Sequence, residues 1–346
     1  MIKATLNSRF RKIQRNIAFW YSYYLKLEKL SYPPLVLNLE PTNLCNLRCP
    51  FCPVALDNID PKIERGLMSQ AIFESILPEI AKIQPLIAIN MGGESTLYPD
   101  LPERIRQLVN LGCYVFLDTN ATKLTPDLSR KLIKSGLSEI VFCIDGEGDA
   151  DSYEQMRVLA DFESTISNVQ EFLRLKKELG TSTPKTVIKN IRYWKEGKQL
   201  TFPTKLISYF SDAPPDFYRS SWADYWPGQH HENVEKTYEV EPFQEDRYSA
   251  CTNLWKKMAI SWDGNVYICC LDLDRTTLIG NVAAQGIMEI WNSQEMQNLR
   301  RKHRQGLQAD IDLCSSCTMI QRAPVKSWSG MLSLRQERFT KFKDET

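Results

Sequence analysis

The sequence lacks a long uninterrupted apolar run, and it lacks an excess of charge of either sign. No stretch approaches the roughly 18 consecutive apolar residues of a membrane-spanning helix, so membrane association is not expected. Lysine and arginine number 43 against 42 aspartate and glutamate residues, and this balance disfavours a strongly charged partner such as nucleic acid. The N-terminus has basic residues but no compact apolar core followed by a cleavage site, so no secretory signal is expected.

The cysteines indicate metal ligation rather than disulfides. Eight of the ten fall in two groups, within 45–52 and 251–317, and no secretory feature accompanies them. An oxygen-sensitive metal cluster requires a reducing compartment, so a cytoplasmic protein is expected. The length of 346 residues is enough for one large α/β domain with a substantial core plus a smaller domain.

Residues 1–34 are predicted to form an amphipathic helical arm that ends at Pro33-Pro34. Its basic residues are interleaved with the aromatic residues Phe19, Trp20, Tyr21, Tyr23 and Tyr24. We favour a helix laid over the domain, because such periodic faces usually pack. A membrane-surface or peptide-docking role is the alternative.

Residues 35–225 alternate short apolar runs with helical segments. The runs that predict buried strands are 35–39, 86–90, 114–118, 139–145, 186–191 and 216–219. Such alternation predicts a mostly parallel sheet. Six strands are too few to close an eight-stranded barrel, so the expected fold class is α/β with a partial (β/α)6 TIM-like barrel. Ligands of such folds lie at the carboxyl ends of the strands.

Local end signals predict the boundaries of three helices in this region. Asp100 and Glu103 form a capping-box pair before one helix, and Thr125 with Pro126 begins a second. Residues 163–179 form the third. The glycines that end them are Gly112, Gly136 and Gly180.

Three further segments follow the barrel: a linker at 226–250, a small β-hairpin and helix domain at 251–320, and a polar tail at 321–346. In the second of these, Asp263-Gly264 predicts a hairpin turn between strands at 258–262 and 266–269. A single helix is predicted over 287–299.

Three cysteines lie in a short loop directly after the first predicted strand: Cys45, Cys49 and Cys52. Three thiolates on one loop can hold three corners of a [4Fe–4S] cluster and leave the fourth iron without a protein ligand. Zinc would need a fourth protein ligand nearby, but no cysteine or histidine lies before Cys45 or between Cys52 and Cys113. The loop therefore favours a cluster with one exchangeable iron.

The segment Glu40–Pro53, which contains this loop, resembles the cluster loop of radical S-adenosylmethionine (SAM) enzymes. The resemblance implies that SAM chelates the open iron and is cleaved by one electron to methionine and a 5′-deoxyadenosyl radical. That radical would abstract a hydrogen atom from the substrate. The resemblance also implies an electron donor such as flavodoxin or ferredoxin, and it places Phe51 beside the adenine.

Two further matches to this family follow the next predicted strands. Gly92-Gly93-Glu94 resembles the Gly-Gly-Glu motif that holds the methionine ammonium of SAM. Its two glycines would let the backbone approach a ligand closely, and an ordinary strand-end turn is the alternative. Thr119-Asn120 resembles the start of a Thr-Asn-Gly motif, which implies Asn120 as another SAM contact.

Asp145 lies in a motif that resembles Ser-Leu-Asp-Gly, with Cys143 in place of the serine. Tyr153 and Arg157 fit a following Tyr-x-x-x-Arg pattern, which implies that Arg157 binds the methionine carboxylate through its two-pronged guanidinium group. A surface salt bridge is the alternative for Arg157. Cys113 and Cys143 are both expected to be buried small apolar side chains.

The second cysteine group offers a complete shell of four thiolates, from Cys251, Cys269, Cys314 and Cys317. The residues alone leave zinc and a [4Fe–4S] cluster both open. The pattern resembles the short "twitch" form of the SPASM extension. This resemblance implies one auxiliary [4Fe–4S] cluster held by these four cysteines.

Cys270 is left over after these four ligands are assigned. Adjacent residues of a strand point to opposite faces, so Cys269 and Cys270 are not expected to face the same iron. Either Cys270 packs in the core, or it is a catalytic free thiol that donates a hydrogen atom to a substrate radical.

The predicted reaction is two-electron oxidation of a small molecule such as a sugar or aminocyclitol, with the auxiliary cluster as electron acceptor. The alternatives are redox-neutral epimerisation with Cys270 as hydrogen donor, peptide modification, and a metal-binding protein without catalysis. Only some 34 residues precede the barrel, which is short for a domain that binds a peptide leader. Candidate substrate contacts are Trp222, Trp226, His230 and His231.

Overall fold

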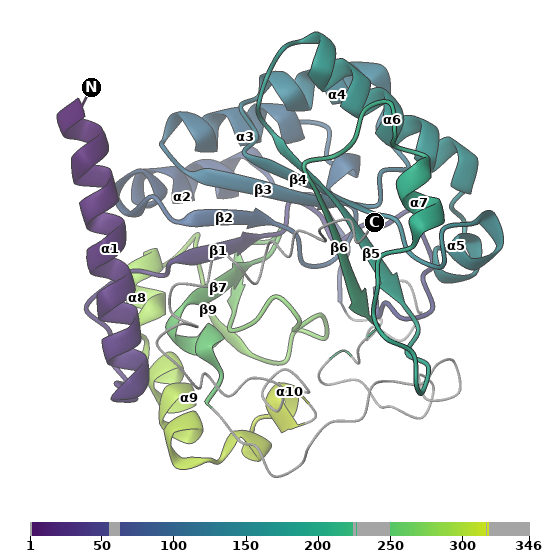
Figure 1. The fold of residues 1–346 in the computed structure, drawn as a ribbon. Helices are drawn as coiled ribbons and strands as arrows, with labels where there is room; N and C mark the ends of the chain where they lie inside the picture. Colours follow the sequence, from purple (N-terminus) through teal and green to yellow (C-terminus); the bar gives the residue numbers. More distant parts are fainter. Residues whose placement is uncertain (1, 55–62, 224–225, 227–249, 316, 318–346) are drawn as a thin grey trace.

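A computed structural model describes residues 2–54, 63–223, 226, 250–315 and 317 (Figure 1). One nine-stranded sheet runs through it in the order β6-β5-β4-β3-β2-β1-β7-β8-β9. All neighbours from β6 to β7 pair in parallel, and β8 and β9 are antiparallel additions. The strands are β1 (Val36–Leu39), β2 (Leu86–Ile89), β3 (Tyr114–Thr119), β4 (Glu139–Cys143), β5 (Lys185–Arg192), β6 (Phe217–Trp222), β7 (Lys257–Ile260), β8 (Asn265–Tyr267) and β9 (Leu278–Asn281).

Helices cover one face of the parallel strands. They are α2 (Gln70–Ile83), α3 (Leu101–Asn110), α4 (Pro126–Lys134), α5 (Ala150–Met156), α6 (Phe162–Glu178) and α7 (Thr204–Ser208). Alternate strand residues such as Leu37 and Leu117 belong to the main core with these helices. Val36, Ala88 and Phe116 form a separate cluster on the opposite side of the sheet, here called the inner face. The predicted partial TIM-like barrel is confirmed.

The predicted hairpin forms, with Gly264 at φ +84° between β7 and β8. It is not a free-standing sheet, because β7 pairs in parallel with β1, Leu37 lying opposite Met258. In Figure 1 the green strand β7 accordingly lies beside β1, and β9 lies farther out at the edge of the sheet. The C-terminal part of the chain therefore extends the barrel sheet at its β1 edge, which the sequence did not indicate.

The prediction of a single helix over 287–299 is wrong. Two helices form instead, α8 (Ile287–Trp291) and α9 (Gln294–Gln305), followed by the short α10 (Asp312–Ser315). Asn292 is the C-cap of the first helix, and Ser293 caps the second, because its hydroxyl oxygen accepts a hydrogen bond from Met296 N at 3.2 Å. A serine at this position favours a new helix start over continuation.

The helix-start predictions have mixed outcomes. Thr125 caps α4 as expected, accepting from Leu128 N at 3.2 Å. The capping box at Asp100 is wrong, since its side chain makes no cap hydrogen bond and instead faces Arg104 at 3.7 Å. The helix expected over 163–179 is α6, capped by Asp161.

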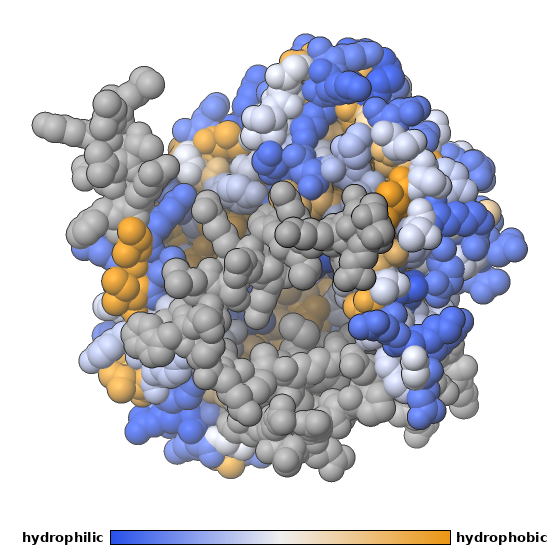
Figure 2. All heavy atoms as spheres, viewed as in Figure 1, coloured by the Kyte–Doolittle hydropathy of each residue, from blue (hydrophilic) through white to orange (hydrophobic). Residues whose placement is uncertain are grey.

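The N-terminal helix α1 (Ile2–Tyr24) lies against the domain, as we favoured. Phe19, Trp20 and Tyr23 are buried, and the Tyr23 hydroxyl donates to the Ala250 carbonyl at 2.6 Å. Its other side exposes Ile13, Ile17, Tyr21, Tyr24 and Leu25, and orange atoms mark this helix at the left of Figure 2. Within the described residues no helix is long and apolar enough to cross a membrane.

Candidate active site

The three-cysteine loop leaves the carboxyl end of β1 and packs into a small apolar cluster. Cys45, Cys49 and Cys52 are free of disulfides, and they pack around Leu47, Phe51, Met156 and Ala223. Two backbone contacts shape the loop: Leu47 N donates to Cys45 Sγ at 3.5 Å, and Cys52 N donates to the Cys49 carbonyl at 3.0 Å.

The chemistry of these thiols fits a metal cluster. Burial raises the pKa of all three, that of Cys52 to about 12, and the negative charges of neighbouring thiolates add to the rise at Cys45 and Cys52. Thiols that influence one another in this way lie close together. A metal that displaces their protons would remove this repulsion.

A single metal ion fits this site less well than a cluster. Among residues 2–54, 63–223, 226, 250–315 and 317, no group of three or more cysteine, histidine, aspartate or glutamate side chains is placed to hold one metal ion. In a [4Fe–4S] cluster each thiolate binds a different iron, so the sulfurs need not converge on one point. The donor set therefore fits the cluster.

Arg157 is a buried partner of Asp145 rather than a surface residue. Its Nε and Nη2 both lie 2.6 Å from Asp145 Oδ2, and Nη1 donates to Cys49 Sγ at 3.8 Å. The guanidinium also lies 5.4 Å from the centre of the Phe51 ring. Burial alone would lower the pKa of Arg157, but the charges of Asp145 and Cys49 raise it well above its usual value. The alternative of a surface salt bridge is thus wrong, and Nη1 of the guanidinium faces the cysteine loop.

Glu94 holds the end of β3 against the loop after β2. Its Oε1 accepts from Thr96 N, Thr96 Oγ1 and Thr119 Oγ1, and its Oε2 accepts from Asn120 N at 2.7 Å. Asn120 Nδ2 in turn donates to Asn46 Oδ1, inside the cysteine loop, at 3.1 Å. These four hydrogen bonds all come from donors within the protein. Oε2 accepts only one of them, so it can accept a further bond from a ligand cation.

The glycines before Glu94 allow contact with the cysteine loop itself, not only with a ligand. Gly93 has φ +74°, and a Cβ there would stand 2.6 Å from the carbonyl oxygens of Thr42 and Leu44. A Cβ on Gly92 would stand 2.8 Å from Glu40 Oε1, to which Gly92 N donates. Only glycine fits this close approach.

Gly93→Ala is expected to lower the free energy of unfolding by about 3 kcal/mol, because it adds a backbone clash to a strained φ. Gly180→Ala is the matched control, since Gly180 has φ +61° and a Cβ added there would meet nothing within 4 Å. That variant should lose only about 1 kcal/mol. Urea unfolding measures both, and equal losses would contradict the clash.

Glu40 forms an ion pair that sequence reasoning missed. The fully buried Glu40 follows β1, and its Oε2 lies 2.6 Å from Arg275 Nη2 although 235 residues separate them. Arg275 also lies over the Tyr267 ring at 5.0 Å. The pair joins the cysteine loop to the hairpin, and no local pattern marks it.

Two of the predicted substrate contacts, Trp222 and Trp226, lie on the side of the sheet where the cysteine loop lies. Trp226 Nε1 donates to the Phe51 carbonyl at 2.7 Å, and Trp222 lies beneath the Arg192 guanidinium at 5.4 Å. His230 and His231 lie outside the described residues. Trp226 is thus a support of the cysteine loop.

The second group of cysteines lies together around Cys251. Burial raises the pKa of Cys251 and Cys314, and the charge of Cys251 acts on Cys269 and Cys314. Cys317 N donates to the Cys314 carbonyl at 3.2 Å. Cys251 is therefore near enough to Cys269 and Cys314 for its charge to act on both, and the charge of Cys317 acts on Cys314.

The expectation that Cys269 and Cys270 face opposite ways is wrong. The strand β8 ends at Tyr267, so both cysteines lie in the following turn, where strand alternation does not apply. The Cys269 thiol donates to Cys270, which lowers the pKa of Cys270 to about 6 with help from Lys257 and raises that of Cys269. Cys270 is thus a neighbour of Cys269.

Cys143 is only partly buried and is not in the main apolar core, in contrast to our expectation. It lies on the inner face beside β5, opposite Lys189 in the sheet register. Burial raises its pKa to about 12, and the charges of Lys189, Arg157 and Asp118 all act on it. Cys113, by contrast, is confirmed as a member of the main core.

The sheet places the two cysteine groups at opposite edges of its inner face. The loop with Cys45 follows the carboxyl end of β1, whereas Cys251 precedes β7, which is parallel to β1. Cys269 follows β8, which runs antiparallel to β7 and so returns to the same amino edge. The inner face between them carries Asp118, which acts electrostatically on both Cys143 and Cys270.

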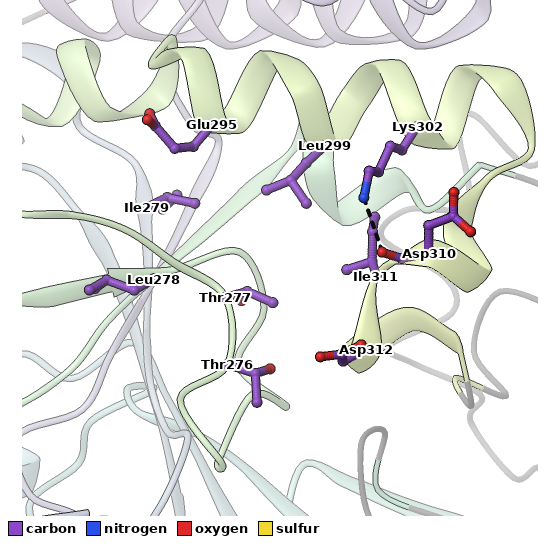
Figure 3. A pocket seen from close by; sticks show the side chains of 10 residues that line it. All are labelled: Thr276, Thr277, Leu278, Ile279, Glu295, Leu299, Lys302, Asp310, Ile311 and Asp312. Atoms are coloured by element: carbon purple, nitrogen blue, oxygen red, sulfur yellow. Dashed lines mark hydrogen bonds between the residues drawn. The ribbon is translucent and has the colours of Figure 1, made fainter.

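A separate cavity of about 310 Å³ lies between α9 and the segment that leads into β9 (Figure 3). Lys302 Nζ donates to the Asp310 carbonyl at 3.0 Å across it. Within the part of the chain that the structure describes, no cysteine of either group lines this cavity. Its lining residues are Thr276, Thr277, Leu278, Ile279, Glu295, Leu299, Lys302, Asp310, Ile311 and Asp312.

Comparison with protein families matches both parts of this site. The model of the radical SAM superfamily matches residues 39–199, and the SPASM iron–sulfur cluster-binding domain matches residues 251–318. The chain is a radical SAM enzyme with a SPASM domain. The two domains imply one [4Fe–4S] cluster each and SAM as a cofactor.

Relatives of this radical SAM enzyme have diverse names. A tungsten-containing aldehyde ferredoxin oxidoreductase cofactor-modifying protein of Pyrococcus furiosus is 23% identical, over 85% of this chain and 92% of that protein. An AdoMet-dependent heme synthase of Methanosarcina barkeri is 31% identical, but the match spans only 40% of this chain and 38% of that protein.

Solved structures share the fold. BtrN in complex with AdoMet and 2-DOIA has a TM-score of 0.53 at 16% identity, covering 84% of this chain and 94% of that one. Streptococcus suis SuiB bound to precursor peptide SuiA has a TM-score of 0.57 at 15% identity, covering 83% and 70%. At these identities the likeness shows the fold alone.

Proposed function

We propose that this radical SAM enzyme oxidises a small polar molecule by two electrons. When bound, SAM and the two clusters supply a 5′-deoxyadenosyl radical for hydrogen abstraction and an acceptor for the second electron. Cys45, Cys49 and Cys52 would hold the first cluster, and Cys251, Cys269, Cys314 and Cys317 the second. A flavodoxin or ferredoxin would supply the electron for SAM cleavage.

The observation that carries this proposal is the position of the two cysteine groups at opposite edges of one inner face. A molecule on that face lies between both, so hydrogen abstraction on one side and electron transfer on the other need no movement of the substrate. The polar side chains on this face suit a small hydrophilic molecule better than an apolar one.

Residues of this chain would position SAM at the carboxyl edge. Asp145 occupies Nε and Nη2 of Arg157. Nη1, which faces Cys49, is therefore the nitrogen available to the methionine carboxylate of SAM. Glu94 Oε2 can take the methionine ammonium, while Phe51 and Asn120 border the loop. BtrN with AdoMet and 2-DOIA supports a small-molecule substrate for this fold.

Isotope labelling separates oxidation from its alternatives. Reconstituted enzyme is incubated in D₂O with compact polyols and amino polyols, and the products are analysed by mass spectrometry. Oxidation predicts a product two hydrogens lighter, one 5′-deoxyadenosine per product, and no solvent deuterium at carbon.

A product of unchanged constitution that carries one solvent deuterium, lost in Cys270→Ala, would overturn oxidation in favour of epimerisation. Cys113→Ala is the control, because Cys113 lies in the main core. Turnover of peptides alone, as the SuiB complex with SuiA would suggest, would overturn the small-molecule substrate.

A further inference from the structure

Three polar side chains form a row across the inner face: Asn38 in β1, Asn90 directly after β2, and Asp118 in β3. Asn38 Nδ2 donates to Asn90 Oδ1 at 2.6 Å, and Asn90 Nδ2 donates to Asp118 Oδ2 at 3.2 Å. The register places Asn38 opposite Ala88, and Ala88 opposite Phe116. Asn38 is therefore level with Ala88 and Phe116, and the row borders the apolar cluster of Val36, Ala88 and Phe116.

The carboxylate fixes the direction of this row. An ionised Asp118 only accepts hydrogen bonds, so Asn90 must turn its NH₂ group toward it. Asn90 then presents its oxygen to Asn38, and Asn38 must use its own NH₂ group there. The oxygen and nitrogen of a side-chain amide are distinguished by their hydrogen-bond partners. The Asp118 carboxylate therefore determines the orientations of both the Asn90 and the Asn38 amides.

This direction leaves one acceptor without a donor. Asn38 is only 3% exposed, and its Oδ1 is buried with no hydrogen-bond partner among the described residues. A buried acceptor without a partner destabilises a fold unless something supplies a donor. Because Asn38 lies on the inner face, a molecule bound there can supply it.

Charges of both signs border the same space. The Asp118 carboxylate lies on β3, and Lys189 lies on β5 opposite Cys143 in the register. Both charges act on Cys143, which lies on the strand between them. The anion and the buried amide oxygen lie within three neighbouring strands, and the Lys189 cation lies two strands beyond Asp118.

We propose that Asn38, Asn90 and Asp118 form the substrate-recognition site, and that it takes a compact polyhydroxylated molecule bearing an amine. The amine pairs with Asp118, an adjacent hydroxyl donates to Asn38 Oδ1, and a further hydroxyl oxygen accepts from Lys189. The two acceptors are separated by one asparagine side chain, which suits neighbouring groups on one ring. This inference rests on the proposed function and names the substrate class for it.

Binding measurements test the site without requiring turnover. Glucosamine, myo-inositol and cyclohexylamine are titrated into anaerobically reconstituted holoenzyme with SAM, and affinity is followed by calorimetry. Glucosamine should bind most tightly, because it alone combines the amine with hydroxyls. Asp118→Asn should remove its advantage over myo-inositol, a loss of about 10-fold or more. Asn38→Leu should weaken the binding of both glucosamine and myo-inositol about 10-fold. The iron content should be unchanged in each variant.

A stability measurement keeps the test independent of the probes. Asn38→Leu removes the unpartnered oxygen but also the donor to Asn90 Oδ1, so the melting temperature of the ligand-free protein should change by less than about 2 °C. Asn190→Leu is the matched contrast, because Asn190 is also buried with an unpartnered Oδ1, but its Nδ2 holds two backbone carbonyls, those of Ile144 and Gly146. That variant should melt at a lower temperature.

Unchanged affinities in Asp118→Asn and Asn38→Leu would overturn the recognition site, as would cyclohexylamine binding as tightly as glucosamine. A melting temperature for Asn38→Leu as low as that of Asn190→Leu would show that Asn38 serves the fold alone. If binding follows the predictions but no oxidised product forms, the recognition site stands and the proposed oxidation fails.

Discussion

Arg275→Met is expected to lower the free energy of unfolding by about 3–5 kcal/mol. The substitution leaves the Glu40 carboxylate fully buried with Gly92 N as its remaining donor. Arg275 is itself mostly buried, and the charge of Glu40 outweighs the effect of burial and raises the pKa of Arg275. Because Glu40 follows β1 and leads into the cysteine loop, cluster loading should fall as well.

Denaturant unfolding and iron analysis of the same preparation measure both effects. Arg106→Met is the matched control, since Arg106 pairs with Glu103 on the surface of α3, where loss of an ion pair costs less than about 1 kcal/mol. The double variant Glu40→Gln with Arg275→Met should recover part of the loss by removing the orphaned charge. A single variant as stable as the control would contradict the role of the pair.

Arg157→Met is expected to reduce 5′-deoxyadenosine formation by about 100-fold or more. It removes the donor to Cys49 Sγ and leaves Asp145 fully buried without its cation. A positive charge beside an iron–sulfur cluster favours its reduced form. The midpoint potential of the first cluster should therefore become more negative, a change that a purely structural role would not produce.

The control for this prediction lies in the same loop. Arg48 is exposed and donates to the backbone carbonyls of Cys45 and Leu47. Arg48→Met should keep both the rate and the potential, measured by product analysis and by redox titration of the electron paramagnetic resonance signal. Equal behaviour of the two variants would refute the assignment of Arg157.

Much of the fold could be predicted because its signals are local. All six barrel strands form where short apolar runs predict them, and the Asp-Gly turn lies where the hairpin needs it. The cysteine loop follows β1 for the same reason, since strand, loop and ligands are adjacent in sequence. The break between α8 and α9 escaped prediction because the apolar pattern continues through Ser293, and only the capping contact begins the second helix.

The errors at the site arise from contacts between distant segments or from the end of a strand. Glu40 and Arg275 are 235 residues apart, and no residue near either of them in the sequence indicates that they pair. The opposite orientation expected of Cys269 and Cys270 depended on a strand that ends at Tyr267. Cys143 is flanked by apolar residues in sequence, yet the register with β5 places it among charges. Domain boundaries and individual ligand roles stay predictions.

Iron content tests the central claim, that two separate clusters border one inner face. Wild-type protein is reconstituted anaerobically beside two triple alanine variants, one at Cys45, Cys49 and Cys52 and one at Cys251, Cys314 and Cys317. We predict about eight irons per chain for the wild type and about four for each variant, with 5′-deoxyadenosine formed when the first group is intact. A wild type that holds only about four irons, or loss of the second group without loss of iron, would contradict the account.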